Sequence, residues 1–146
     1  MKVFLSWSGE RSQALAEAVK DWLQLVLHYV EPWLSQLDIE AGERWATEVA
    51  KELEASNFGI IAITRANLSS PWILFEAGAL ARSIQEGRVV PLLLDIEFKD
   101  VTGPLAQFQS KKVDMSGLTD VVRALNSLSK VPIPDGRLNQ LVELAW

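Results

Sequence analysis

The feature that most constrains the fold is the run Phe58-Gly59-Ile60-Ile61-Ala62-Ile63-Thr64, in which apolar residues follow one another without alternation. A strand with one face in water alternates apolar and polar residues. A strand in the middle of a parallel sheet is covered on both faces and is apolar throughout. Residues 3–5 and 89–94 have the same character. The sequence therefore predicts a parallel sheet with both faces covered.

The segments between these strands carry apolar residues at helical spacing. Pro71 follows a pair of serines, which is the pattern of a capped helix start with proline in its first turn. The first helix is expected to begin after Gly9 and to end at His28. Further helices are expected at residues 45–53, 71–84, 118–128 and 138–146.

Two weaker strands complete the predicted sheet, at residues 32–35 and 107–113. Lys111 and Lys112 would discourage pairing beyond the second of these, which suits an edge strand. Pro91 must lie near the start of its strand or at an unpaired position, because proline has no N–H to donate. Five strands that alternate with helices predict an α/β, flavodoxin-like three-layer fold with strand order 2-1-3-4-5.

This strand order also predicts where a ligand binds. On open α/β sheets, ligands bind beyond the carboxyl ends of the strands, at the point where the strand order reverses. Here that point lies between the first and third strands. Residues 6–9 and 64–71 follow those two strands, and the loop 38–43 follows the second.

The composition narrows the chemistry. The chain has 146 residues, no cysteine and a single histidine, His28, so disulfides, thiolate nucleophiles, Cys-based zinc sites and a Ser-His-Asp triad are excluded within it. A net charge of −5 has the wrong sign for non-specific nucleic-acid binding. No apolar run approaches the roughly 20 residues that cross a bilayer. The chain also lacks the glycine-rich signatures of dinucleotide-binding and P-loop sites.

Trp72 and Glu76 form the most informative pair of residues. They are four apart on the helix predicted at residues 71–84, so they project from one face, and uncharged residues 77–81 follow Glu76. On spacing alone, a local cap or ion pair for Glu76 and simple packing for Trp72 are the more common explanation of such a short pattern.

One reaction suits a lone carboxylate beside an indole. When the bond between a ribose carbon and a cationic nicotinamide ring breaks, the leaving group departs neutral and needs little acid assistance. Positive charge then builds on the sugar, where one carboxylate can stabilise it. An aromatic side chain such as Trp72 could stack on the ring and exclude water.

Taken in order, several segments resemble a bacterial TIR (Toll/interleukin-1 receptor) domain of the NAD⁺-cleaving type. The resemblance extends over residues 1–130, and its strength comes from the ordered set of segments, since each alone is a weak signal. The matching segments are residues 3–8, 38–42, 57–64, 67–80 and 104–109.

The resemblance implies NAD⁺ glycohydrolase activity, which releases nicotinamide and leaves ADP-ribose or cyclic ADP-ribose. Glu76 matches the family's catalytic glutamate and Trp72 the tryptophan before it. NAD⁺ is then a substrate, no cofactor is implied, and no metal is expected. The residues that match segments lining the nucleotide pocket are Ser6, Trp7, Ser8 and Asp38.

The resemblance also implies a mode of action. Such domains become active when an attached sensor or oligomerisation module clusters them, through heterologous contacts that can propagate as filaments. In bacteria they commonly act in the cytoplasm as anti-phage effectors. Residues 1–130 are expected to form the TIR domain, and residues 131–146 a helical extension or the start of a linker to a fused sensor domain.

Two other functions are compatible with the sequence. The first is a non-enzymatic module that docks other TIR domains. The second is a nucleoside deoxyribosyltransferase-like enzyme, in which Glu76 would be a covalent nucleophile. A carboxylate on an apolar helix face favours an enzyme over a docking module, and base exchange would identify the transferase.

Overall fold

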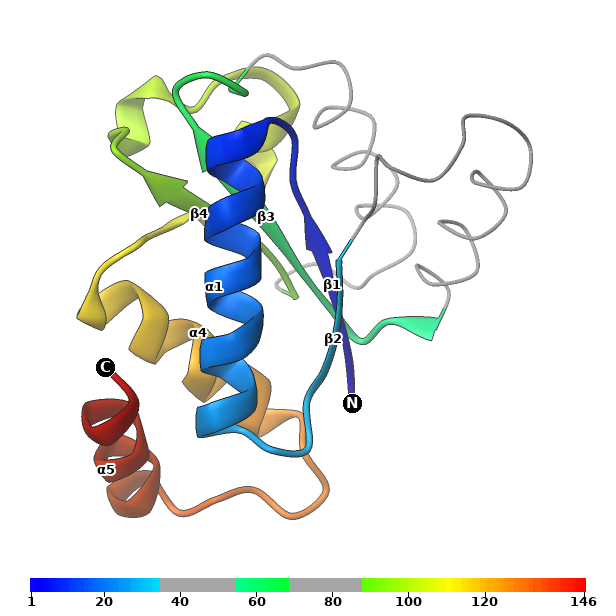
Figure 1. Cartoon of the computed structure of the whole chain (residues 1–146), viewed down its shortest axis with the longest axis vertical. Coiled ribbons are helices and arrows are strands. Elements are labelled where there is room, and N and C mark those ends of the chain that lie inside the picture. The colour runs from blue at the N-terminus through cyan, green and yellow to red at the C-terminus, as the bar shows by residue number, and fades with distance from the viewer. Residues whose placement is uncertain (35–54, 69–87) are drawn as a thin grey trace.

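The computed structural model describes residues 1–34, 55–68 and 88–146, and it confirms the predicted fold (Figure 1). Its sheet has five parallel strands in the order β2-β1-β3-β4-β5. The helices predicted at residues 45–53 and 71–84 lie outside the described residues. The strands are β1 (Lys2–Ser6), β2 (Glu31–Leu34), β3 (Phe58–Thr64), β4 (Val89–Leu94) and β5 (Lys111–Lys112).

Successive side chains of the central strands enter two separate apolar clusters, because side chains alternate between the faces of a strand. Val3 and Leu5 belong to one cluster, and Phe4 between them belongs to the other. All of β3 is buried, as its unbroken apolar run predicts. The sheet therefore has a covered face on each side.

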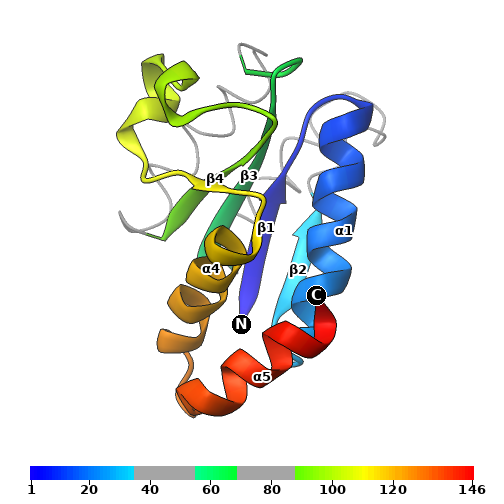
Figure 2. The same ribbon diagram turned by 90° about the vertical axis from the view of Figure 1, so that its left-hand side faces the viewer.

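The three described α-helices, which Figure 2 shows beside the sheet, contribute buried residues to the larger cluster. They are α1 (Glu10–Val26), α4 (Met115–Ser127) and α5 (Asp135–Ala145). Helix α5 packs against α1 and α4, and its buried residues Leu138 and Val142 join the core. The described cover of the second face includes Leu105, from the short helix η2 (Gly103–Gln107).

Pro91 lies at an unpaired position, as predicted. It is opposite Ile61 of β3, but the neighbouring residues show that its nitrogen faces the other side of the strand. The carbonyl of Arg88 accepts a hydrogen bond from Gly59 of β3, and that of Leu93 accepts one from Val113 after β5. The backbone N–H and carbonyl groups of odd-numbered residues in β4 thus point towards the β5 side. Strand β5 begins only opposite Leu92, so in the part of the chain that the structure describes Pro91 has no strand neighbour on that side. The missing N–H of proline therefore costs no ladder hydrogen bond.

Two predicted boundaries differ from the structure. Strand β5 holds only Lys111 and Lys112 of the expected 107–113, and Gln107 is instead the last residue of η2, which has Pro104 in its first turn. Helix α1 ends at Val26, so His28 lies beyond the helix rather than at its end. No helix within residues 1–34, 55–68 and 88–146 is both long and apolar enough to cross a membrane.

Candidate functional site

The candidate site is the sheet edge where β1 and β3 end side by side. Strand β1 pairs with β2 on one side and with β3 on the other, so the strand order reverses at this point. The last β1–β3 pair is Ser6 with Ile61, and β3 continues to Thr64. After β1 the chain enters α1, and after β3 it continues as the turn at residues 65–68. This is the edge where open α/β sheets bind ligands.

A buried serine connects the beginning of α1 to β3. The Ser12 hydroxyl accepts a hydrogen bond from the N–H of Ser8 at 3.1 Å and donates one to the carbonyl of Ala62 at 2.8 Å. Ala62 lies one residue beyond the last β1–β3 pair. The side chain therefore gives this carbonyl a partner where the β1–β3 ladder has stopped.

A buried asparagine completes the connection from the other side. The amide nitrogen of Asn67 donates hydrogen bonds to the carbonyls of Ser8 and Ala62, both at 3.0 Å. Its amide oxygen accepts one from the N–H of Thr64 at 2.7 Å. Asn67 is only 3% exposed, so water competes little for these bonds.

We call Ser8, Ser12, Ala62 and Asn67 the Ser8 clip. Within it, the N–H and the carbonyl of Ser8 are each held by a buried side chain, Ser12 for the first and Asn67 for the second. The residues that follow β1 are thereby fixed against those that follow β3. Buried polar networks with all partners present are rigid and specify one geometry.

Three of the six predicted site residues lie at this edge. Ser6 is fully buried at the end of β1, and Ser8 is half-buried in the clip. Trp7 is 5% exposed and belongs to the apolar cluster that contains α1 residues, and its indole nitrogen has no hydrogen-bond partner among the described residues. Roles for these three in binding stay predictions.

The other three predicted site residues, Asp38, Trp72 and Glu76, lie outside the described residues. Their proximity to the Ser8 clip therefore stays a prediction. The distance between Trp72 and the clip is limited by the chain itself, because Asn67 precedes Trp72 by only a few residues.

Ser12 and Asn67 were not expected as site residues. A signal for Ser12 exists in the sequence, because it lies at helical spacing from Leu15, Ala16 and Val19, on the stripe that is otherwise apolar. A serine on such a stripe indicates a buried hydroxyl that must find a partner. Asn67 lies within residues 64–71, which the sequence places at the binding edge, but nothing in the sequence indicates that its side chain is buried, since asparagine is common in exposed turns.

Ion pairs join the segments at the rim of the same edge. Arg11, in the first turn of α1, pairs with Asp95, which follows β4 directly and has a positive φ of 59°. The sequence alone allows either phosphate binding or simple solvation for Arg11. The structure gives its guanidinium a carboxylate partner, with both side chains more than half exposed.

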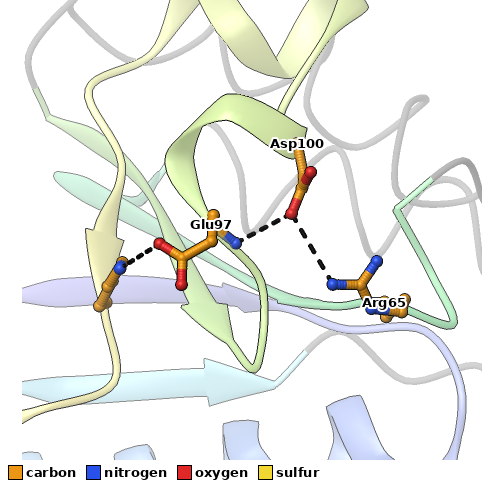
Figure 3. Close-up of polar contacts among 4 residues, drawn as sticks. Arg65, Glu97 and Asp100 are labelled. Carbon is orange, nitrogen blue, oxygen red and sulfur yellow. Dashed lines mark hydrogen bonds and ion pairs between the residues drawn. The ribbon is translucent and has the colours of Figure 1, made fainter.

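A second set of ion pairs connects β3, β4 and β5 (Figure 3). Arg65, after β3, has its guanidinium 3.7 Å from the carboxylate of Asp100, which accepts a hydrogen bond from the N–H of Glu97 at 3.1 Å. The Glu97 carboxylate accepts one from Lys112 of β5 at 2.6 Å. Exposed pairs of this kind contribute little to stability singly. Together they connect the loop that follows β4 to Arg65 and to β5.

Potential metal ligands do not converge in residues 1–34, 55–68 and 88–146, where no group of three or more His, Asp or Glu side chains could hold a metal ion. What the described edge offers is a preorganised backbone turn with charged side chains around it.

Comparison with known proteins agrees with this fold. A family model described as TIR domain matches residues 3–128. One similar solved structure is that of the TIR domains of the activated Roq1 resistosome that directly recognises the pathogen effector XopQ. It has a TM-score of 0.52 and 18% identity, and the match covers 99% of this chain and 82% of that one. At this identity the likeness shows the fold alone. No curated protein sequence matches the chain.

Proposed function

The chain belongs to the TIR domain family, and we propose that it cleaves NAD⁺ to nicotinamide and ADP-ribose, linear or cyclic. The observation that carries this proposal is the Ser8 clip. It holds the exit of β1, with the predicted site residues Ser6 and Ser8, against the exit of β3. Residues 69–87, which contain Trp72 and Glu76, follow this β3 exit in the chain.

The proposed reaction breaks the bond between C1′ of the ribose and the nicotinamide nitrogen. The electron pair of that bond goes to the ring nitrogen, so a cationic pyridinium leaves as a neutral molecule. The sugar becomes oxocarbenium-like, and the Glu76 carboxylate stabilises it. Water adds to C1′ and loses a proton to give ADP-ribose, or a nitrogen of the adenine takes its place in the cyclic product.

This chemistry agrees with the residues that the chain has. Because the leaving group departs neutral, one carboxylate can replace the pair of acids that glycosidases use. No thiolate or second histidine is needed, and NAD⁺ is consumed as a substrate. Trp72 is proposed to stack on the nicotinamide and Asp38 to line the nucleotide pocket.

We propose further that activity depends on self-association. A neighbouring copy would complete the pocket, and contacts of a heterologous kind would allow filaments to form. Clustering by a fused sensor domain would then switch the enzyme on, and depletion of NAD⁺ in the cytoplasm would make it an anti-phage effector.

The test is release of nicotinamide from NAD⁺ by the chain clustered artificially at high concentration. Glu76→Gln, which keeps the shape of the side chain and removes its charge, should abolish release while circular dichroism shows an intact fold. Asp135→Asn is a matched control, because it removes an exposed carboxylate from α5 and should leave release unchanged.

Clustered wild type that leaves NAD⁺ intact would instead favour a docking module for other TIR domains. Exchange of the nicotinamide for an added free base, with a trapped adduct on Glu76, would favour the transferase.

A further inference from the structure

The Ser8 clip contains two buried side chains that the proposed reaction does not itself require. Ser12 and Asn67 are 1% and 3% exposed, so neither is placed to contact a ligand in solution. Both donate to the same acceptor, the carbonyl of Ala62, and both bind the backbone of Ser8. Their contacts join segments that are 50 and 59 residues apart in the chain.

The clip also engages both backbone polar groups of Ser8. Its N–H donates to Ser12 and its carbonyl accepts from Asn67. With both groups engaged inside the protein, the backbone of Ser8 is locked, and the turn from β1 into α1 has one geometry. Gly9, with a φ of 89°, follows at once and makes the sharp entry into the helix.

We propose that Ser12 and Asn67 are positioning residues, which act through Ser8 to hold the β1 exit in the geometry that binds the nucleotide. This inference rests on the proposed function, because it assumes that the β1 exit lines the NAD⁺ pocket. Neither residue touches substrate or the reacting atoms. Their contribution is preorganisation, so that binding does not have to order the turn.

The inference predicts a particular kinetic signature. If the clip orders a binding surface, its loss weakens the substrate complex and the transition state equally, so KM rises while kcat changes little. Ser12→Ala removes the acceptor for the Ser8 N–H and one of the two donors to Ala62, and leaves Asn67 in place. We expect KM for NAD⁺ to rise about tenfold. Asn67→Ala, which frees both the Ser8 carbonyl and the Thr64 N–H, should raise KM at least as much.

The structure offers a matched control for Asn67. Asn126 is also a buried asparagine, 4% exposed. Its amide also joins separate segments, but it belongs to α4 and bonds the backbone of Ile133. Asn126→Ala should lower the melting temperature about as much as Asn67→Ala does, and it should leave the KM for NAD⁺ unchanged. A merely structural role for Asn67 would make the two variants behave alike.

The experiment measures kcat and KM for nicotinamide release by the clustered wild type, Ser12→Ala, Asn67→Ala and Asn126→Ala, and ADP-ribose binding by titration. A rise in KM confined to Ser12→Ala and Asn67→Ala supports the inference. An unchanged KM in Ser12→Ala, or an equal rise in Asn126→Ala, overturns it. Ser12→Ala keeps the test decisive if Asn67→Ala does not fold.

Failure of the proposed function has a different outcome. A wild type that binds ADP-ribose but releases no nicotinamide contradicts the proposed reaction, and weaker binding by Ser12→Ala would still support the clip. A wild type that binds neither ADP-ribose nor NAD⁺ overturns both proposals.

Discussion

The hydroxyl of Tyr29 donates a hydrogen bond to the amide oxygen of Asn126 at 3.0 Å, across 97 residues of chain. The same amide oxygen accepts from the N–H of Ile133, and the amide nitrogen donates to the carbonyl of Ile133 at 2.8 Å. One buried side chain thus fastens the turn that follows α1 and the α4–α5 connection to each other.

We expect Asn126→Ala to reduce the free energy of unfolding by about 2 kcal/mol, because it leaves two partly buried backbone groups at Ile133 without this partner. Tyr29→Phe removes only the hydroxyl bond and should cost about 1 kcal/mol. Urea unfolding followed by circular dichroism measures both. Equal losses in the two variants would contradict the role given to the Ile133 contacts.

Tyr29 also predicts a dependence of stability on alkaline pH. Burial raises the pKa of Tyr29 above its usual value of 10.0, and a hydrogen bond with Ser129 partly opposes the shift. The folded protein therefore holds the phenolic proton more tightly than the unfolded chain does. The contribution to stability is full below pH 10 and falls as the pH rises through the window between the unfolded and folded pKa values.

Urea midpoints measured from pH 8 upwards should show this decline, and Tyr29→Phe should make it shallower. If the urea midpoint of Tyr29→Phe falls with pH as steeply as that of the wild type, groups other than Tyr29 cause the loss of stability.

Gly117 lies where no side chain fits. A Cβ built there would be 2.0 Å from the carbonyl oxygen of Lys112. The Gly117 N–H also donates to the Asp114 side chain at 2.7 Å, which caps α4. We expect Gly117→Ala to destabilise the fold by about 3 kcal/mol, in the range for overpacking a close contact.

Gly136 supplies the matched control, because a Cβ there meets nothing within 4 Å and it lies in the first turn of α5. Gly136→Ala should stabilise the protein by about 0.5 kcal/mol, since alanine loses less backbone entropy in a helix. Thermal unfolding of Gly117→Ala and Gly136→Ala measures both changes in stability. A neutral Gly117→Ala would mean that α4 can move away from β5 without cost.

The proposed dependence on self-association predicts how activity varies with concentration. Nicotinamide release per molecule should rise with protein concentration, because more chains then have a neighbour that completes the pocket. Initial rates across a dilution series measure this, with sedimentation velocity on the same samples. A constant rate per molecule would show that one chain holds the whole site.

Much of the fold could be predicted from the sequence because the signals are local. The unbroken apolar run of β3 indicates burial on both faces, and helical spacing identifies α1 and α4. Handedness and connection length then leave few possible strand orders. The sequence predicts too long a strand for β5. The length of an edge strand depends on where the chain after η2 comes beside β4, and residues 107–113 do not specify this by themselves.

The candidate site divides in the same way. The sequence is enough to predict the sheet edge between β1 and β3, because alternating strands and helices leave few possible strand orders. It also identified Glu76 and Trp72 as the pair on which the proposed chemistry depends. The bonds from Ser12 and Asn67 to Ser8 are visible only in the folded chain. Those hydrogen bonds join residues distant in the chain, and no local pattern specifies which buried donor will meet which carbonyl.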